Sequence, residues 1–135
     1  MPKYTFKASL EYLEAAIDVV VDSLGELGID HKAAYKIHLA LDELLTNVVS
    51  YAYEDEVGNM DIIYEIKDDP KVLEITIIDE GKPFNPLELK DPDLDSGVSE
   101  RKIGGLGIFI VRQIMDEMEY VRKDNKNILT IRKKV

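Results

Sequence analysis

Three groups of residues in this 135-residue chain have types and spacings that suit the binding of a charged ligand. The first is Glu43 with Asn47: because they stand four residues apart in a predicted helix, both side chains project from one side of it. An asparagine oxygen is a suitable ligand for Mg²⁺ beside phosphates, and a nearby glutamate can take a proton from a nucleophile. A solvated polar pair at a helix edge has the same spacing, so the pair alone leaves both interpretations open.

The second group, Asp79 and Gly81, ends a predicted strand. Side-chain alternation places Asp79 on the same strand face as Ile75 and Ile77. If that is the core face, the carboxylate needs a hydrogen-bond donor, and the exocyclic amine of adenine would supply one. Gly81 would let the backbone turn sharply and approach a ligand closely. An ordinary turn after a strand is the alternative.

The third group is the glycine turn Gly104-Gly105-Leu106-Gly107, which leads into an apolar helix. Glycines at a helix start expose backbone N–H groups, and the helix dipole favours anions there. Arg101 and Lys102, just before the turn, add positive charge. The turn is not a P-loop, because no Gly-Lys-Ser or Gly-Lys-Thr follows, and it does not follow a strand as a dinucleotide-binding fingerprint does. A flexible loop-to-helix junction is the alternative.

Periodicity predicts the elements that position these groups. Strands are expected near residues 3–8, 57–67, 72–79, 119–124 and 127–134. Helices are expected from a cap at Ser9 to Gly25 and Gly28, from a cap at Asp30 to about Tyr53, and over about 105–118. This order predicts an α+β fold, a two-layer sandwich in which a mostly antiparallel mixed sheet is covered on one face by three helices.

Residues 82–103 match neither a helix nor a strand, because they hold three prolines, one glycine and three aspartates without apolar periodicity. A structureless loop of about 20 residues is unusual in a small domain unless it has a function. Since glycine motifs flank the segment, we expect a lid over a ligand, with a surface insertion as the alternative. The chain length predicts one domain over residues 1–135.

The net charge of −10 argues against binding to nucleic acid or to anionic membranes and suits a basic protein partner. The chain has no cysteine and only two histidines, which excludes disulfides and makes a metal cluster unconvincing. No apolar run approaches the roughly 20 residues that span a bilayer, and the first residues lack the apolar core of a signal peptide. We therefore expect a soluble cytoplasmic protein.

Taken together and in this order, the three groups resemble the motifs of the GHKL ATPase superfamily, which includes gyrase, heat-shock chaperone, histidine kinase and mismatch-repair ATPase domains. Its helix motif is matched by Glu43 and Asn47, its Asp-x-Gly motif by Asp79 and Gly81, and its second glycine box by residues 105–107. Within the superfamily the chain most resembles the bacterial anti-sigma factor serine/threonine kinases. The supporting segments are Leu-Asp-Glu-Leu-Leu-Thr-Asn at 41–47, Tyr-Ala-Tyr at 51–53 and Gly-Gly-Leu-Gly-Ile at 104–108.

The resemblance implies a Bergerat-type sandwich that binds ATP with Mg²⁺. Asn47 would coordinate the Mg²⁺ between the phosphates, Glu43 would be the base that activates a serine or threonine hydroxyl, and Asp79 would recognise the adenine amine. Gly81 and the turn 104–107 would shape the adenine and phosphate walls. The implied partners are a sigma factor and, as substrate, a STAS-type anti-anti-sigma protein, and the family is commonly homodimeric.

The chain departs from the family pattern at two places. Family members often carry Gly-Thr at the start of the last strand, where the threonine helps bind adenine, but Lys126-Asn127 stands here. Asn127 has the strand parity of Leu129 and Ile131, so we expect it to point inward and to bind the nucleotide, whereas Thr130 has the opposite parity. The glycine box also lacks an arginine directly before it, which leaves residues 101–102 as the nearest cations.

Two other functions stay open. One is a non-catalytic module that holds a regulator in a nucleotide-dependent way, although the intact Glu43 argues against it. The other is the ATPase domain of a histidine kinase without its dimerisation part. Against that, Leu39 rather than an acidic residue follows His38, and no second helical hairpin presents a histidine.

Overall fold

A computed structural model of the chain describes residues 3–53, 58–68, 70–88 and 105–135. It confirms the predicted α+β order of elements. The strands are β1 (Lys3–Lys7), β2 (Asn59–Lys67), β3 (Val72–Asp79), β4 (Glu117–Lys123) and β5 (Lys126–Lys134). The helices are α1 (Leu10–Glu26), α2 (His31–Asn47) and α3 (Gly105–Ile114), with a π-helical turn Val48–Ala52 and a 3₁₀ turn Pro86–Glu88.

The five strands form one sheet in the order β1-β2-β3-β5-β4. Each of the four pairings among the described strands is antiparallel. Asp124 and Asn125 close the β4–β5 hairpin with φ angles of 53° and 62°. Positive φ at both central residues matches the right-handed twist of the strands, so this hairpin fixes Asn127 opposite Asp79 at the end of β3.

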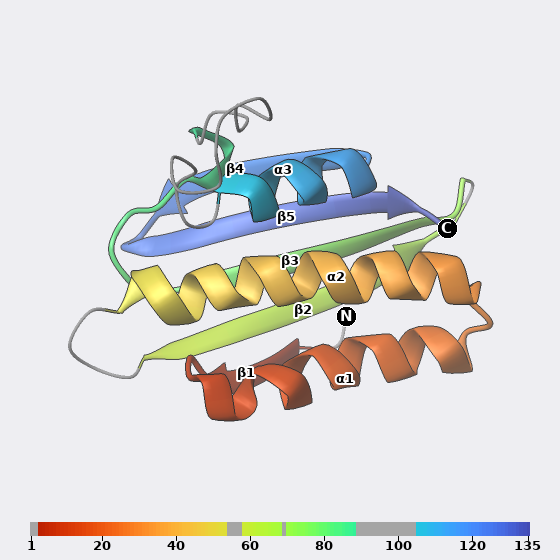
Figure 1. Cartoon of the computed structure of the whole chain (residues 1–135), viewed down its shortest axis with the longest axis horizontal. Helices are drawn as coiled ribbons and strands as arrows, with labels where there is room; N and C mark the ends of the chain where they lie inside the picture. The colour runs from red at the N-terminus through yellow and green to blue at the C-terminus, as the bar shows by residue number, and fades with distance from the viewer. Residues whose placement is uncertain (1–2, 54–57, 69, 89–104) are drawn as a thin grey trace.

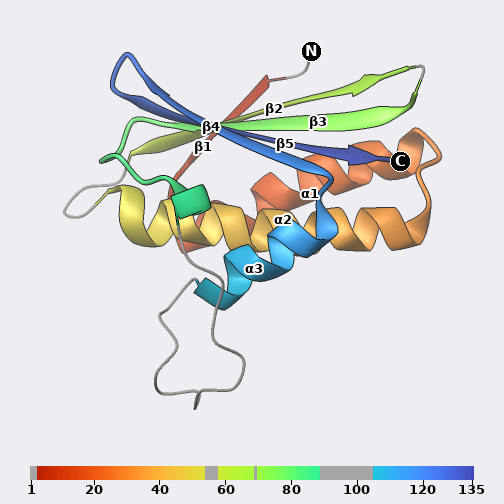
Figure 2. The ribbon, with the colours of Figure 1, turned by 90° about the horizontal axis from the view of Figure 1, so that it is seen from above.

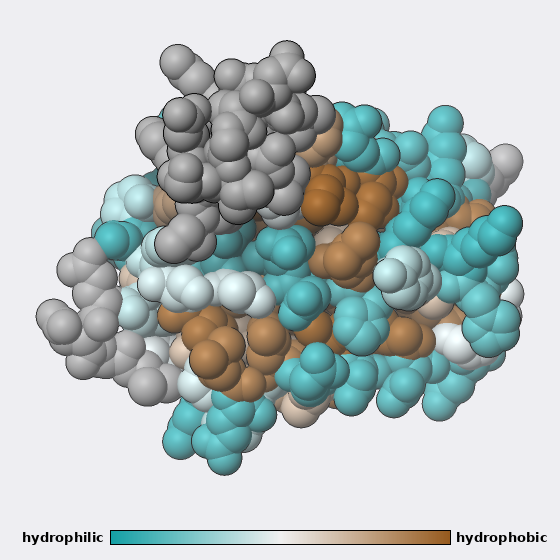
Figure 3. All heavy atoms as spheres, viewed as in Figure 1, coloured by the Kyte–Doolittle hydropathy of each residue, from teal (hydrophilic) through white to brown (hydrophobic). Residues whose placement is uncertain are grey.

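The three helices cover one face of the sheet, as predicted, and leave the other face open (Figures 1 and 2). The core fills the space between these two layers, because the inward residues of β2, β3 and β5 and one stripe of each helix are buried. Over the helix layer, hydrophobic side chains gather on α3 and between α1 and α2 (Figure 3). No helix in the described part of the chain is long and apolar enough to cross a membrane.

Several predicted boundaries were wrong by a few residues. Helix α1 ends at Glu26, between the two glycines predicted to end it, and Gly28 supplies the positive φ of 76° at which the chain leaves it. Ser9 occupies the N-cap position of α1 without a side-chain capping bond, whereas Asp30 caps α2 by accepting a hydrogen bond from the Lys32 N–H. The third helix stops at residue 114 and β4 begins at residue 117, because the inward face from Met118 onwards has the period of a strand.

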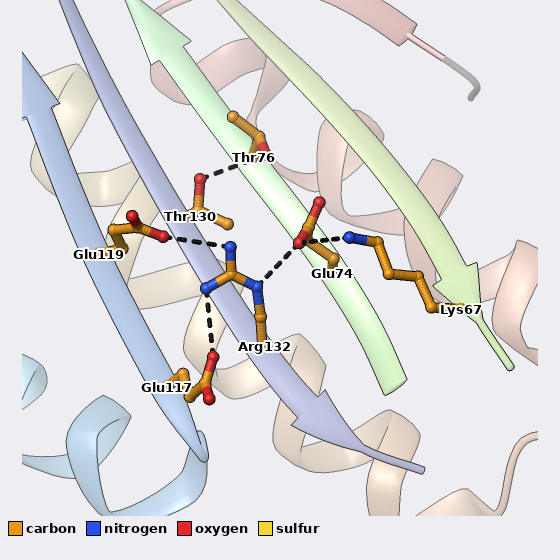
Figure 4. Close-up of polar contacts among 7 residues, drawn as sticks. All are labelled: Lys67, Glu74, Thr76, Glu117, Glu119, Thr130 and Arg132. Atoms are coloured by element: carbon orange, nitrogen blue, oxygen red, sulfur yellow. Dashed lines mark hydrogen bonds and ion pairs between the residues drawn. The ribbon is translucent and has the colours of Figure 1, made fainter. Parts of the chain in front are cut away.

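The open face of the sheet carries a charged cluster centred on Arg132 of β5 (Figure 4). Its guanidinium donates to Glu74 at 2.8 Å, to Glu117 at 3.2 Å and to Glu119 at 3.1 Å. Lys67 joins through Glu74 at 3.2 Å. Because one arginine bridges β3, β4 and β5, the cluster ties together three strands on the side that no helix covers.

Candidate nucleotide-binding site

A pocket lies between the C-terminal part of α2 and the sheet, beside the ends of β3 and β5. It contains about 410 Å³ of empty space, open solvent at its mouth included. The three buried polar residues of the described chain, Asn47, Asp79 and Asn127, all line it, with exposed fractions of 7%, 6% and 5%. Buried polar groups need partners, so their gathering in one pocket indicates a site built for a polar ligand.

Asn47 has an unsatisfied amide. It is the last residue of α2, where the regular helix gives way to the π-helical turn, an irregularity frequent at functional sites. Its Nδ2 atom is buried and has no hydrogen-bond partner in the described structure. A buried amide without a partner costs stability, so the geometry fits a ligand that brings an acceptor to this point.

Asp79 ends β3 on the face that packs against the helices, which confirms the parity predicted from the sequence. Its Oδ1 accepts hydrogen bonds from the Gly81 N–H and from Nδ2 of Asn127, both at 2.9 Å. Burial raises the pKa of the Asp79 carboxyl, and these two donors with the nearby Arg122 charge lower it in part. The carboxylate is thus desolvated but anchored, as a group that recognises a ligand amine must be.

Gly81 approaches the backbone of its own chain rather than turning at a positive φ. A Cβ atom at this position would lie 2.2 Å from the carbonyl oxygen of Ala52. Lys82 then donates its N–H to that same oxygen at 2.9 Å. Gly81 therefore lets the end of β3 pack against the π-helical turn that follows Asn47, and this contact brings two of the predicted motifs together.

Glu43 lies one turn of α2 before Asn47 and faces the start of α3. A Cβ atom at Gly107 would lie 1.9 Å from Oε2 of Glu43, so the carboxylate occupies the space that the missing side chain leaves. Burial raises the pKa of the Glu43 carboxyl, and the negative charge of Asp42 adds to this rise. Glu43 is thus a half-buried carboxylate with increased proton affinity at the N-terminal turn of a helix, which suits a general base.

The segment after Gly81 covers the pocket with an aromatic side chain. Phe84 lines the pocket and stacks on Tyr51, with ring centroids 5.7 Å apart and an interplanar angle of 22°. Phe84 therefore forms part of the wall that a ligand base would meet.

Side chains of α3 and β4 hold this segment in place. Arg122 donates to the carbonyl oxygen of Gly81 at 2.7 Å, and Arg112 donates to that of Leu87 at 2.5 Å. Sequence reasoning missed both arginines and Tyr120, which also lines the pocket. Tyr120 and Arg122 could have been found by alternation, because β4 turns its even-numbered residues inward.

The structure brings most of the predicted site residues together. Asn47, Asp79 and Asn127 line the pocket, and Gly81 packs against Ala52 of its wall. Glu43 lies one helical turn before Asn47, beside Gly107. Asn127 points inward as expected. Residues 105–107 form the first turn of α3 beside Glu43. The predicted residues 101, 102 and 104, and most of the predicted lid over 82–103, lie outside the described residues.

The chain belongs to the family of histidine kinase-like ATPase domains, whose model matches residues 6–133. This match confirms the superfamily that the motifs resemble. Among its relatives are proteins named serine-protein kinase RsbW. That of Bacillus mycoides is 25% identical over 126 residues, which cover 90% of this chain and 78% of the relative. That of Halalkalibacterium halodurans is 29% identical over 133 residues, which cover 96% of this chain and 80% of the relative.

Solved structures agree on the fold. The RsbU and RsbW domains of Rv1364c from Mycobacterium tuberculosis match 99% of this chain with a TM-score of 0.66 at 14% sequence identity. The match covers 32% of that longer chain. The histidine kinase domain of Erythrobacter litoralis EL346 matches 90% of this chain and 60% of its own, with a TM-score of 0.57 at 20% identity. At these identities the likeness shows a shared two-layer architecture.

Proposed function

We propose that this protein is an ATP-dependent serine/threonine protein kinase and anti-sigma factor. It transfers phosphate to an anti-anti-sigma protein of the STAS type and sequesters a sigma factor. The observation that supports the proposal best is the unpartnered, buried Asn47 amide. It lines the same pocket as Asp79, the carboxylate that we assign to base recognition, and lies one helical turn after Glu43, a half-buried carboxylate of raised pKa. The relatives named serine-protein kinase RsbW support the same activity.

Asp79, Asn47 and the first turn of α3 each bind a different part of the nucleotide in this proposal. Asp79 accepts a hydrogen bond from the exocyclic amine of adenine in the innermost part of the pocket. The Asn47 amide faces the phosphates, where its nitrogen donates to a phosphate oxygen and its oxygen serves as a ligand for Mg²⁺. The backbone N–H groups of the first turn of α3, which begins at Gly105, offer a favourable site for the terminal phosphates.

Asn47 fits Mg²⁺ as an ion shared with the nucleotide phosphates. The described chain contains no group of three or more carboxylate, histidine or cysteine side chains that would hold a metal. Mg²⁺ commonly keeps several waters and binds through one or two protein oxygens and the substrate phosphates, which matches a site with Asn47 as its ligand. When bound, the ion neutralises charge that develops on the phosphate oxygens.

Glu43 performs the proton transfer in the proposed reaction. A serine or threonine hydroxyl of the partner protein gives its proton to Glu43 while its oxygen forms a bond to the γ-phosphorus. The bond between that phosphorus and the β–γ bridging oxygen breaks, and ADP leaves. The raised pKa of Glu43 favours this step, because a stronger base takes the proton more readily.

The test separates nucleotide binding from phosphate transfer. Calorimetric titration with Mg-ATP measures the first, and radiolabelled phosphate on the purified anti-anti-sigma partner measures the second. Glu43→Gln keeps the shape of the side chain, so it should retain ATP affinity within a few-fold and lose roughly 10²- to 10⁴-fold in transfer rate. Wild-type protein that binds ATP without transfer would refute the kinase and favour the non-catalytic binding module.

The partners are proposed on the family resemblance and on charge. The net charge of −10 favours encounter with a basic surface on the sigma factor, and the homodimer expected for the family is part of the same proposal. Leu39 rather than an acidic residue follows His38, so a histidine kinase reaction has less support than serine/threonine transfer. Phosphate on a histidine of this chain, recognised because it is stable to base and labile to acid, would favour the histidine kinase reaction over serine/threonine transfer.

A further inference from the structure

The side chain of Asn127 has used its hydrogen-bonding capacity within the protein. Its Oδ1 accepts from the Phe84 N–H at 3.3 Å and from the Tyr120 hydroxyl. Its Nδ2 donates to Oδ1 of Asp79 at 2.9 Å and to the carbonyl oxygen of Lys82 at 2.8 Å. Because an amide side chain has two donor hydrogens and two acceptor lone pairs, this set leaves no bond for a nucleotide.

These partners fix which way the amide points. The Phe84 N–H can only donate, and the Lys82 carbonyl can only accept. In the opposite orientation the amide nitrogen would face a donor, and the amide oxygen would face two acceptors. The hydroxyl of Tyr120 reinforces the observed orientation by donating to Oδ1. Asn127 is therefore a defined donor toward Asp79.

The consequence for Asp79 is a fixed carboxylate. Asn127 from β5 and the Gly81 N–H both donate to Oδ1, so these two bonds leave the lone pairs of Oδ2 unused. Donors that bind the ionised form help keep a buried carboxylate ionised. A fixed, ionised carboxylate accepts a hydrogen bond from a base that carries an exocyclic amine, and it gives no partner to a base that lacks the amine.

We propose that Asn127 is a positioning residue that sets the base selectivity of the nucleotide pocket through Asp79, without contacting the nucleotide itself. This inference rests on the proposed function, and it narrows the ligand to a purine nucleotide with an exocyclic amine. It also replaces the direct contact expected for Asn127 by an indirect one. The pairing of Asn127 with Asp79 across β3 and β5 makes the role possible, because the sheet register sets the two residues side by side.

The test compares two ligands that differ only at the amine. Calorimetry measures the affinities for ATP and for purine riboside triphosphate, which lacks the exocyclic amine. Wild-type protein should prefer ATP by about 10- to 100-fold, the range for a hydrogen bond to a charged group. Asn127→Ala should lower the affinity for ATP about tenfold and leave the affinity for the analogue within about twofold of wild type. The ratio of the two affinities should therefore fall about tenfold.

Conservative variants separate positioning from a general loosening of the loop at Lys82 and Phe84. Asn127→Thr removes the two loop bonds and leaves a shorter hydroxyl donor at the same strand position. An ATP preference above that of Asn127→Ala would therefore report a donor toward Asp79 rather than the loop. Thr130→Val is the matched control, because Thr130 lies on the same strand but faces the open side of the sheet, where it meets Thr76. It should leave the preference unchanged.

The possible results lead to distinct conclusions. An ATP preference that stays at its wild-type value in Asn127→Ala would overturn the inference, even if both affinities fell together, because equal weakening reports only a structural role. The proposed function would stand in that case. Wild-type protein that binds neither nucleotide would overturn the proposed function, and the inference would fall with it.

Discussion

Gly107 offers a sharp test of the catalytic geometry, because its missing side chain makes room for Glu43. In Gly107→Ala the new Cβ would lie 1.9 Å from Oε2 and 2.6 Å from Cδ of Glu43. Ordinary van der Waals contact needs more than 3 Å, so the carboxylate must retreat by more than about 1 Å. Since a misplacement of about 1 Å can cost roughly 100-fold in rate, we expect phosphate transfer to fall by about that factor.

The assay combines transfer kinetics with thermal unfolding. Glycine to alanine in a helix usually stabilises by about 0.5–1 kcal/mol, so Gly107→Ala should lose rate while its melting temperature stays close to wild type. Gly25→Ala is the matched control: it lies in α1, where an added Cβ meets nothing within 4 Å. It should keep the full rate.

A double variant shows whether Gly107 acts through Glu43. If its only role is to make room for that carboxylate, the combination of Gly107→Ala with Glu43→Gln should be no slower than Glu43→Gln alone. Full activity in Gly107→Ala would refute the reasoning. So would a double variant whose losses multiply, because Gly107 would then serve the phosphates independently of Glu43.

Three further outcomes follow from the contacts. Gly81→Ala forces a Cβ to within 2.2 Å of the Ala52 carbonyl oxygen, so we expect a loss of about 2 kcal/mol or more in urea unfolding; wild-type stability would contradict that close approach. Arg132→Met should cost about 1–2 kcal/mol at neutral pH and leave ATP affinity unchanged. The Arg132 hydrogen bond lowers the pKa of Glu74. The difference in unfolding free energy between wild type and Arg132→Met should therefore shrink as the pH falls and Glu74 becomes protonated. A difference that stays constant down to acid pH would contradict a stabilising Arg132–Glu74 ion pair. Burial raises the pKa of Asp79, so ATP affinity should fall with decreasing pH, with a midpoint above the usual aspartate range. We expect Asp79→Asn to bind ATP more weakly than wild type and to lack that transition.

The fold could be predicted from the sequence because its elements have clear periods. The strands alternate, the helices carry apolar stripes, and Asp30 and Gly28 mark helix ends by their local chemistry. The end of α2 could not be predicted. Regular helical spacing continues past Asn47, but tertiary packing of the Ala52 carbonyl against Gly81 accompanies a wider, π-helical turn there. Such a turn depends on a contact between residues far apart in the chain.

The site was predictable where a side chain follows strand or helix parity. Asp79 and Asn127 point inward because alternation demands it. What Asn127 binds to was not predictable, because its partners include backbone groups of Lys82 and Phe84 that come close only when β3 and β5 pair. The role of Gly107 was also hidden, since a glycine cluster does not reveal which side chain fills the space beside it.

The same residues explain why the site should respond strongly to its nucleotide. The Asn47 amide nitrogen has no partner within the described protein, and burial raises the pKa of both Glu43 and Asp79. The unpartnered amide costs folding free energy, because a buried polar group without a hydrogen bond is not compensated for its lost hydration. A nucleotide that hydrogen-bonds to both Asn47 and Asp79 therefore offsets part of this cost in folding free energy. Because a ligand that binds only the folded state stabilises it further as its concentration exceeds Kd, ATP binding and the stability of the α2–β3 contact should rise together.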